Sequence, residues 1–368
     1  MSVLFEATEI NGMTLSNRFV RSATWEGLAS PDGSCTSKLV SFMETLAQGG
    51  LGLIISGHTY IRPDGQVTPW QLGVYKDEQV EGLKAMTEAV HRHGGRIVLQ
   101  LSHGGFFAHT RLIKQAPFAP SGTVEVFGKL PRKEMTPQDI ETFVEAFRKG
   151  AGRAKLAGFD GVQIHAAHGY LLNQFLSPAF NHRQDQYGGN IRGRAKFLVD
   201  VLYKIRDEVG ADYPILVKIN SEDFLEGGLT VKDSVDAALI LRDAGADAVE
   251  VTGGTTVSGD MEPSRKAIDL IEQEAYFRHA ARIIRDKTRM PVMLVGGIRS
   301  FDLAERLVLE GWTDYISMAR PLIREPGLVN RWKAGDLRRA ECRSVNKCFR
   351  PGLKGKGIYC LVDRKAKK

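Results

Sequence analysis

Short apolar runs rich in β-branched residues alternate with longer amphipathic stretches along most of this chain. The apolar runs are nearly continuous, which is typical of parallel strands that are covered on both faces. This pattern predicts eight strands, at Phe19–Ser22, Leu53–Ser56, Ile97–Leu101, Gly161–His165, Ile215–Ile219, Ala248–Val251, Val292–Val295 and Tyr315–Met318. Amphipathic periodicity predicts helices between them, at Asp77–His93, Pro137–Ala157, Arg192–Val209, Val231–Ala244, Gln273–Lys287 and Phe301–Leu309.

The ends of several predicted helices carry the residues that usually start and stop a helix. Hydroxyl side chains that can accept a bond from the first turn precede three helices, at Thr136, Thr230 and Ser300. Glycines that can take up a left-handed conformation follow three helices, at Gly158, Gly245 and Gly311. These signals support the predicted helix boundaries.

Eight strands alternating with helices predict an α/β protein with a (β/α)₈ barrel. The alternative is an open doubly wound sheet, which calls for a glycine-rich turn after the first strand. The sequence at that point is RSATWEG, which contains no such turn. Asn11-Gly12 predicts a tight hairpin that plugs one end of the barrel. We expect the barrel to occupy residues 1–335, followed by an extension at 336–368.

Two long connections follow the third and fourth strands, at Gly104–Met135 and Ala166–Ile191. Loops of this length in a compact domain are usually functional. In a barrel, the loops at the carboxyl ends of the strands build the active site. Both connections are therefore expected on the catalytic face.

Composition narrows the class of protein. Hydrophobic residues make up 43% of the chain and charged residues 25%, which excludes disordered, collagen-like and disulfide-scaffold proteins. The sequence contains no apolar run long enough to span a membrane and no signal-peptide pattern at its start. Four cysteines fit a reducing compartment, so we expect a cytoplasmic protein.

The net charge of +7 is concentrated at one end of the sequence. Residues 338–368 hold eleven Lys and Arg against Glu341 and Asp363, so the rest of the chain is slightly acidic. Such an extension is either a solvated end or a site for an anionic partner. No nucleic-acid-binding motif is recognisable, and neither nucleic acid nor a membrane is expected as a partner.

The densest group of chemically active residues lies in HAAHGYLLNQFLSPAFNHRQDQYGGN, residues 165–190. His165 ends the fourth strand, and His168 and Tyr170 follow within five residues, so three proton-carrying side chains can meet in one cavity. A purely structural, hydrogen-bonded histidine pair is the alternative. A zinc site is disfavoured because the spacing is not that of an HExxH helix.

Seven segments, all in the same order, resemble the old yellow enzyme family of NAD(P)H-dependent FMN ene-reductases. They are LSNRFVRSAT, GLGLIISGHTYI, IVLQLSHGG, HAAHGY, LVKIN, VGGI and ISMARPLIREP, and the resemblance covers most of residues 2–335. The resemblance implies a barrel that binds FMN, acts on a small molecule with NADH or NADPH as electron donor, and is often a homo-oligomer.

By this resemblance, His165 and His168 bind the carbonyl oxygen of an α,β-unsaturated substrate. Hydride would pass from the flavin to the β-carbon, and Tyr170 would protonate the α-carbon. One alternative is a flavin enzyme that works in the oxidative direction, a dehydrogenase or demethylase of a small amine or enone. Another is a non-catalytic flavoprotein that acts through its basic extension.

The same resemblance implies the cofactor-binding residues. Gln100 would bond the pyrimidine edge of the flavin, and Lys218, where many members carry arginine, would supply a cation near N1. The other implied contacts are Ser22, Ala23 and Thr24 along the ring, Gly57 or His58 after the second strand, and Gly296, Gly297, Ala319 and Arg320 at the phosphate.

The sequence departs from the family in two loops. Trp25 and Gly27 stand near the positions where some bacterial members carry a cysteine and a tyrosine. Trp25 is expected either to stack over the substrate or to pack against the hairpin plug. Phe106 and Phe107 replace an Arg-Lys pair and make the third loop more apolar.

The C-terminal extension resembles the cysteine-rich tail of larger relatives, the 2,4-dienoyl-CoA and 2-enoate reductases. In those proteins four cysteines hold a [4Fe–4S] cluster. Here Cys342, Cys348 and Cys360 are present, but Val345 occupies a ligand position. We therefore expect neither a [4Fe–4S] cluster nor another bound metal. Because the FAD- and NAD-binding regions of those relatives are not in this sequence, we expect NADH or NADPH to act directly on FMN.

Overall fold

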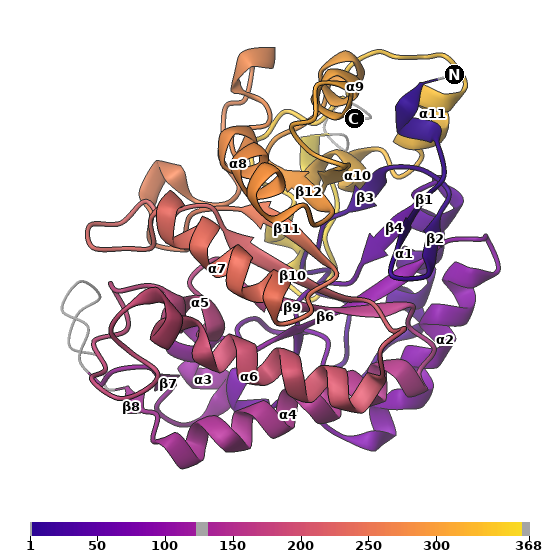
Figure 1. Ribbon diagram of the computed structural model, residues 1–368. Helices are drawn as coiled ribbons and strands as arrows, with labels where there is room; N and C mark the ends of the chain where they lie inside the picture. Colours follow the sequence, from indigo (N-terminus) through magenta and orange to yellow (C-terminus); the bar gives the residue numbers. More distant parts are fainter. Residues whose placement is uncertain (1, 123–131, 363–368) are drawn as a thin grey trace.

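The computed structural model describes residues 2–122 and 132–362, and its centre is a closed barrel of eight parallel strands (Figure 1). The pairing of β4 with β6 closes the ring, so the predicted (β/α)₈ architecture is confirmed. All eight predicted strands are present, each within one residue of its expected ends. They are β3 Phe19–Arg21, β4 Leu53–Ile55, β6 Ile97–Ser102, β9 Gly161–Ala166, β10 Ile215–Asn220, β11 Ala248–Thr252, β12 Val292–Val295 and β13 Tyr315–Met318.

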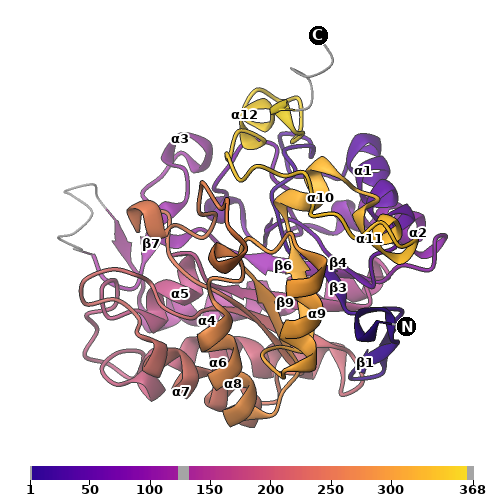
Figure 2. The same cartoon turned by 90° about the horizontal axis from the view of Figure 1, so that it is seen from above.

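Helices pack around the outside of the barrel (Figures 1 and 2). The larger ones are α1 Ser37–Gln48, α2 Val80–His91, α4 Pro137–Leu156, α6 Ile191–Val209, α7 Val231–Asp243, α8 Arg278–Thr288 and α9 Phe301–Leu309. The shorter ones are α3 Thr110–Ile113, α5 Leu171–Leu176, α10 Arg320–Arg324, α11 Leu328–Lys333 and α12 Phe349–Gly352. Among the described residues, none of the helices combines the length and apolarity needed to cross a membrane.

Most of the predicted helix signals are confirmed. Thr136 and Thr230 each form a reciprocal cap with an aspartate three residues later. The three predicted C-terminal glycines have φ angles between 71° and 90°. The prediction for Ser300 is wrong, because its hydroxyl donates instead to the buried carboxylate of Glu274 at 2.9 Å.

Two helices begin later than the periodicity predicts. Residues Asp77–Gln79 form a 3₁₀ turn before α2, and α8 starts at Arg278 rather than Gln273. The delay at α8 has a tertiary cause. The carboxylate of Glu274 is fully buried and accepts bonds from the backbone N–H groups of Arg299 and Ser300, which holds this segment out of the helix.

The predicted hairpin is formed by β1 Thr8–Ile10 and β2 Met13–Leu15. Asn11 and Gly12 both have positive φ angles, 43° and 78°, as a tight primed turn requires. The apolar side chains of the hairpin are buried in one cluster with residues from seven of the barrel strands. The hairpin therefore plugs the amino-terminal end of the barrel, as predicted.

The two long connections lie beyond the carboxyl ends of β6 and β9, on the predicted face. The first contains α3 and the short strands β7 Phe118–Ala119 and β8 Lys133–Glu134. Phe106 and Phe107 pack edge-on against Phe180 of the second connection. These aromatic contacts join the two long connections.

The described part of the C-terminal extension folds back onto the barrel. The N–H of Ile358 donates to the carbonyl oxygen of Glu26 at 2.9 Å, and Arg324 of α10 pairs with Glu341 at 2.6 Å. Figure 2 shows α12 of this segment, in yellow, near α10. Specific contacts therefore hold the residues up to Val362 on the barrel, although many of their side chains are exposed.

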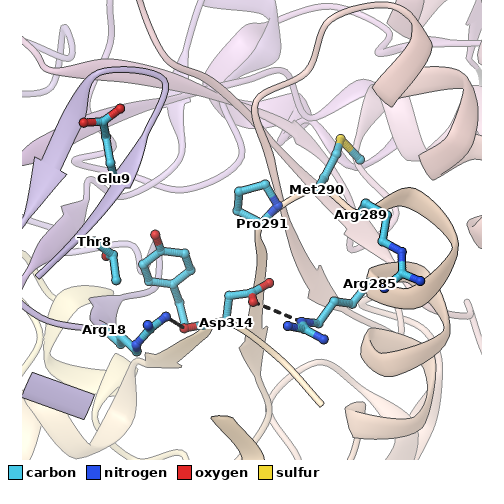
Figure 3. A pocket seen from close by; sticks show the side chains of 9 residues that line it. Thr8, Glu9, Arg18, Arg285, Arg289, Met290, Pro291 and Asp314 are labelled. Carbon is cyan, nitrogen blue, oxygen red and sulfur yellow. Dashed lines mark hydrogen bonds and ion pairs between the residues drawn. The ribbon is translucent and has the colours of Figure 1, made fainter. Parts of the chain in front are cut away.

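A cavity of about 300 Å³ lies at the amino-terminal end of the barrel, beside the hairpin (Figure 3). Arg285 and Arg18 flank Asp314 in it. Arg285 Nε donates to Asp314 Oδ1 at 3.0 Å, and the N–H of Val292 donates to Oδ2 at 2.9 Å. Because Asp314 links α8 to β12, we assign this region a role in stability, which is usual for the amino-terminal end of a barrel.

The substitution Asp314→Asn is expected to lower the free energy of unfolding by about 1–3 kcal/mol, because the amide leaves either Arg285 or Val292 without its acceptor. The control is Asp286→Asn on α8, whose pair with Arg282 is 3.8 Å long and half exposed. That change should cost less than about 0.5 kcal/mol. Urea unfolding measures both, and equal losses would contradict the assignment.

Candidate active site

A cavity of about 200 Å³ opens at the carboxyl ends of the barrel strands and gathers residues from distant parts of the chain. Its lining consists of Ser22, Ala23, Thr24, Trp25, His58, Gln100, His165, His168, Tyr170, Lys218, Thr252, Pro263, Ser264, Val295, Ala319, Arg320 and Phe349. Every predicted site residue lines this cavity except three glycines. Gly297 lines a neighbouring cavity, and Gly57 and Gly296 line neither.

His165, His168 and Tyr170 converge as predicted. The ring centroid of His165 lies 5.1 Å from that of His168 and 4.9 Å from that of Tyr170, in edge-to-face contacts. His168 has a left-handed backbone with φ of 64°, and its N–H donates to Asn220 Oδ1 at 3.1 Å. This bond holds the turn after β9 in the conformation that brings the three rings together.

Burial keeps both imidazoles neutral. It lowers the pKa of His165 and of His168 well below the usual value, and the nearby charge of Lys218 acts in the same direction. His168 Nε2 is paired with Thr252 Oγ1 at 2.9 Å, whereas the buried Nδ1 of His165 has no partner. A buried polar atom without a partner is costly in isolation, which indicates a place for a ligand atom.

The phenol of Tyr170 is buried, and this burial raises its pKa above the usual value. The side chain is therefore protonated at neutral pH and can act as a proton donor. The ring of His58 lies 5.5 Å from that of Tyr170, and burial lowers the pKa of His58 to about 4. The opposite shifts have one cause, because a low-dielectric surrounding disfavours the charged form of each group.

A chain of buried polar side chains crosses the interior of the barrel beneath the cavity. Gln100 Nε2 donates to Gln163 Oε1 at 2.7 Å, and Gln163 Nε2 donates to Glu250 Oε2 at 3.0 Å. Lys218 Nζ lies 3.1 Å from the same carboxylate oxygen and donates to Ser22 Oγ at 2.8 Å. Sequence reasoning identified Gln100, Lys218 and Ser22 but missed Gln163 and Glu250. Their signal was a polar residue within an otherwise apolar strand.

The first loop is held by a buried ion pair. Arg21 Nη2 lies 3.0 Å from Glu26 Oε1, and the N–H of Gly57 donates to the same oxygen at 2.9 Å. A Cβ atom at Gly57 would lie 2.3 Å from Glu26 Oε2, so only glycine fits there. Gly57 thus helps to hold the first loop through its bond to Glu26, whereas His58 is the residue after β4 that lines the cavity.

Trp25 forms part of the cavity wall rather than packing against the hairpin. Its Nε1 donates to the carbonyl oxygen of Pro69 at 3.2 Å, and its ring contacts Gly352 of α12. Phe349 of the same helix also lines the cavity, although sequence reasoning gave it no role. The C-terminal extension therefore contributes to the wall of the site.

A smaller cavity of about 40 Å³ adjoins the first one and shares Ala319 and Arg320 with it. Arg299, which sequence reasoning missed, also lines it. Its buried Nε and Nη2 make no hydrogen bond to a described residue, and Nε lies 3.9 Å from Glu274 Oε1. Arg320 Nη1 donates to Asn346 Oδ1 at 2.6 Å. Two buried guanidinium groups beside the backbone of Gly297 form a surrounding that suits a phosphate.

Cys342, Cys348 and Cys360 line a third small cavity together with Val345. Burial raises the pKa of Cys348 to about 11, and Arg324 Nη1 lies 3.8 Å from Cys360 Sγ. Within residues 2–122 and 132–362, no group of three or more His, Cys, Asp or Glu side chains is arranged to hold a metal ion. The three thiols therefore gather in one place without forming a metal-binding arrangement.

Comparison with known proteins identifies related sequences. The profile of the NADH:flavin oxidoreductase / NADH oxidase family matches residues 3–338. A metal reductase of Desulforamulus reducens is 34% identical over 369 residues, which is 100% of this chain and 54% of that protein. An NADPH dehydrogenase of Geobacillus thermodenitrificans is 37% identical over 326 residues, covering 88% of this chain and 92% of the relative. The chain thus spans about half the length of some curated relatives and nearly all of others.

Two solved structures are similar to this chain in fold and sequence. A 2-naphthoyl-CoA reductase in complex with 2-naphthoyl-CoA superposes with a TM-score of 0.90 and 27% identity, over 98% of this chain and 56% of that one. An old yellow enzyme homologue from Zymomonas mobilis gives a TM-score of 0.77 and 27% identity, over 93% of this chain and 95% of that one.

The substitution Glu26→Ala is expected to lower the free energy of unfolding by about 3–5 kcal/mol, because it leaves the buried guanidinium of Arg21 without its partner. The matched control is Glu6→Ala. The pair between Glu6 and Arg18 is 3.8 Å long and largely exposed on the glutamate side, so its loss should cost at most about 1 kcal/mol. Chemical denaturation compares the two variants, and a small effect at Glu26 would show that the ion pair does not hold the loop.

Proposed function

The chain belongs to the NADH:flavin oxidoreductase / NADH oxidase family, and from this premise we propose that it is an FMN enzyme that uses NADH or NADPH to reduce the C=C bond of α,β-unsaturated carbonyl compounds. The observation that carries this proposal is the convergence of His165, His168 and Tyr170 on the same cavity as Gln100 and Lys218. Polar groups for a carbonyl oxygen, a proton donor and a cation for a flavin are thus available together.

The residues at the two cavities suit FMN. Gln100 and Lys218 would face the pyrimidine end of the ring, and Ser22, Ala23 and Thr24 would lie along it. The buried guanidinium of Arg299, whose Nη2 makes no hydrogen bond to a described residue, supports a phosphate at the adjoining cavity, where Arg320 and Gly297 would assist. When bound, FMN supplies the hydride for the C=C bond.

The two histidines would bind the carbonyl oxygen of the substrate. Each neutral imidazole offers one N–H donor, and the unpartnered Nδ1 of His165 supports the presence of a ligand atom nearby. A hydrogen bond to the carbonyl oxygen draws electron density from the conjugated C=C bond. The bond becomes stronger as negative charge develops on that oxygen, so it lowers the barrier to reduction.

Tyr170 would then deliver the proton that completes the reduction. Its phenol is held protonated by burial, and it lies against His165, the side chain that would hold the carbonyl group. A donor fixed beside the bound carbonyl is well placed to reach the α-carbon. The walls formed by Trp25 and Phe349 would exclude water from this step.

Wild-type protein reconstituted with FMN is expected to reduce 2-cyclohexenone with NADH or NADPH. Tyr170→Phe should lower that turnover by about 10²–10⁴-fold, because it removes the proton donor, while flavin bleaching by NADH or NADPH continues. The control is Tyr203→Phe, an exposed tyrosine on α6, which should retain full turnover. Turnover and anaerobic stopped-flow spectra measure the two steps. A wild type that binds FMN but does not reduce the enone would contradict the proposal.

The pH profile of kcat/KM is expected to be flat between about pH 6.5 and 9. Burial lowers the pKa of His165 and His168 and raises that of Tyr170, so none of these groups titrates in that range. Activity should fall only at higher pH, when Tyr170 loses its proton. An inflection near pH 6.5 that disappears in His165→Asn would show that this histidine is charged in the active enzyme.

A further inference from the structure

We propose that Glu250 is a positioning residue that holds the ammonium of Lys218 toward the flavin and offsets part of its charge, and so sets the redox potential of bound FMN. The inference rests on the proposed function, because it concerns the same cavity. It assigns a role to a residue that does not itself line the cavity.

The register of the strands puts Glu250 at the same level as two site residues. Lys218 of β10 is the direct cross-strand partner of His165 on β9 and of Glu250 on β11. Residues paired across parallel strands point to the same side of the sheet, here the interior of the barrel. Glu250 therefore lies one strand beyond the lysine, with its side chain directed inward.

The contacts of the carboxylate are specific. Its Oε2 lies 3.1 Å from Lys218 Nζ and 3.0 Å from Gln163 Nε2, and the Glu250 side chain is fully buried. Because Glu250 takes the amide N–H of Gln163, the oxygen of Gln163 is turned toward Gln100. One carboxylate thus orients both side chains that would face the pyrimidine end of the flavin, Lys218 directly and Gln100 through Gln163.

Electrostatics then link Glu250 to the cofactor. Reduction of a flavin places negative charge near N1, and a buried cation at that point stabilises the reduced form. A carboxylate next to the ammonium lowers the net positive potential that the flavin experiences. In a low-dielectric interior this effect is large, because buried charges are poorly screened. Removal of the carboxylate should therefore favour the reduced flavin.

The test compares Glu250→Gln with the wild-type holoenzyme. The amide can still accept a bond from Gln163 or Lys218 but carries no charge, so the midpoint potential of bound FMN is expected to become more positive. Sulfite, which adds to oxidised flavin and leaves negative charge near N1, should bind more tightly by about tenfold or more. Spectroelectrochemistry and sulfite titration provide the two readouts, neither of which depends on turnover.

The matched control is Asp247→Asn. Asp247 precedes the same strand at the opposite end of the barrel, pairs with Arg206 at 2.7 Å and accepts the N–H of Ile215 at 2.7 Å. This substitution also removes an ion-paired carboxylate, but one far from the cavity. It is expected to leave the potential and the sulfite affinity unchanged, which separates a local charge effect from a general loss of stability.

The outcomes separate this inference from the proposed function. A Glu250→Gln variant that binds FMN with an unchanged or lower potential overturns the role of Glu250 and leaves the proposed function standing. A wild type that cannot bind FMN overturns both. If Glu250→Gln does not fold, Glu250→Asp serves instead, because it withdraws the carboxylate from Lys218 by one methylene. That variant should show a smaller shift in the same direction, and the absence of any shift overturns the inference.

Discussion

The register between neighbouring parallel strands is the constraint on which the rest of this structure depends. Once the ring is closed by β4 and β6, a residue on one strand has a fixed partner on the next. Lys218 consequently lies between His165 and Glu250, and Gln100 lies opposite Gln163. A shift of one residue in any of these strands would turn these side chains out of the barrel. The register thus brings polar side chains of β6, β9, β10 and β11 together inside the barrel.

Burial then decides the protonation of each group in that cavity. The same low-dielectric surrounding keeps His165 and His168 neutral and Tyr170 protonated. A buried ammonium without an ion-pair partner would be destabilising, but Glu250 Oε2 lies 3.1 Å from Lys218 Nζ. Neutral imidazoles and a paired cation can therefore line the same cavity. The groups differ because Lys218 has a charged partner in Glu250, whereas His165, His168 and Tyr170 have none among the described residues.

Segments distant from the barrel strands complete the site. Gly352 of α12 contacts Trp25 of the first loop, and Phe349 of the same helix lines the cavity with Trp25, so segments near the two ends of the sequence form one wall. Arg299 and Arg320 follow consecutive strands and enclose the adjoining cavity. Glu274 holds the segment that contains Arg299, since its carboxylate accepts hydrogen bonds from the backbone N–H groups of Arg299 and Ser300. The basic extension thus contributes to the wall of the cavity.

The sequence by itself determined the eight strands, the hairpin and the meeting of His165, His168 and Tyr170, because periodicity, turn residues and short spacing are local properties. Resemblance to a family added Gln100 and Lys218. Only the tertiary structure revealed that Gln163 and Glu250 bond to the residues beneath the cavity and that Arg299 and Phe349 line the two cavities, since each depends on contacts between residues far apart in the chain. It likewise displaced the start of α8 and gave Ser300 a buried carboxylate as its partner. Local pattern specifies which segments become strands and helices, whereas register and burial, which arise only on folding, decide what each polar side chain can do.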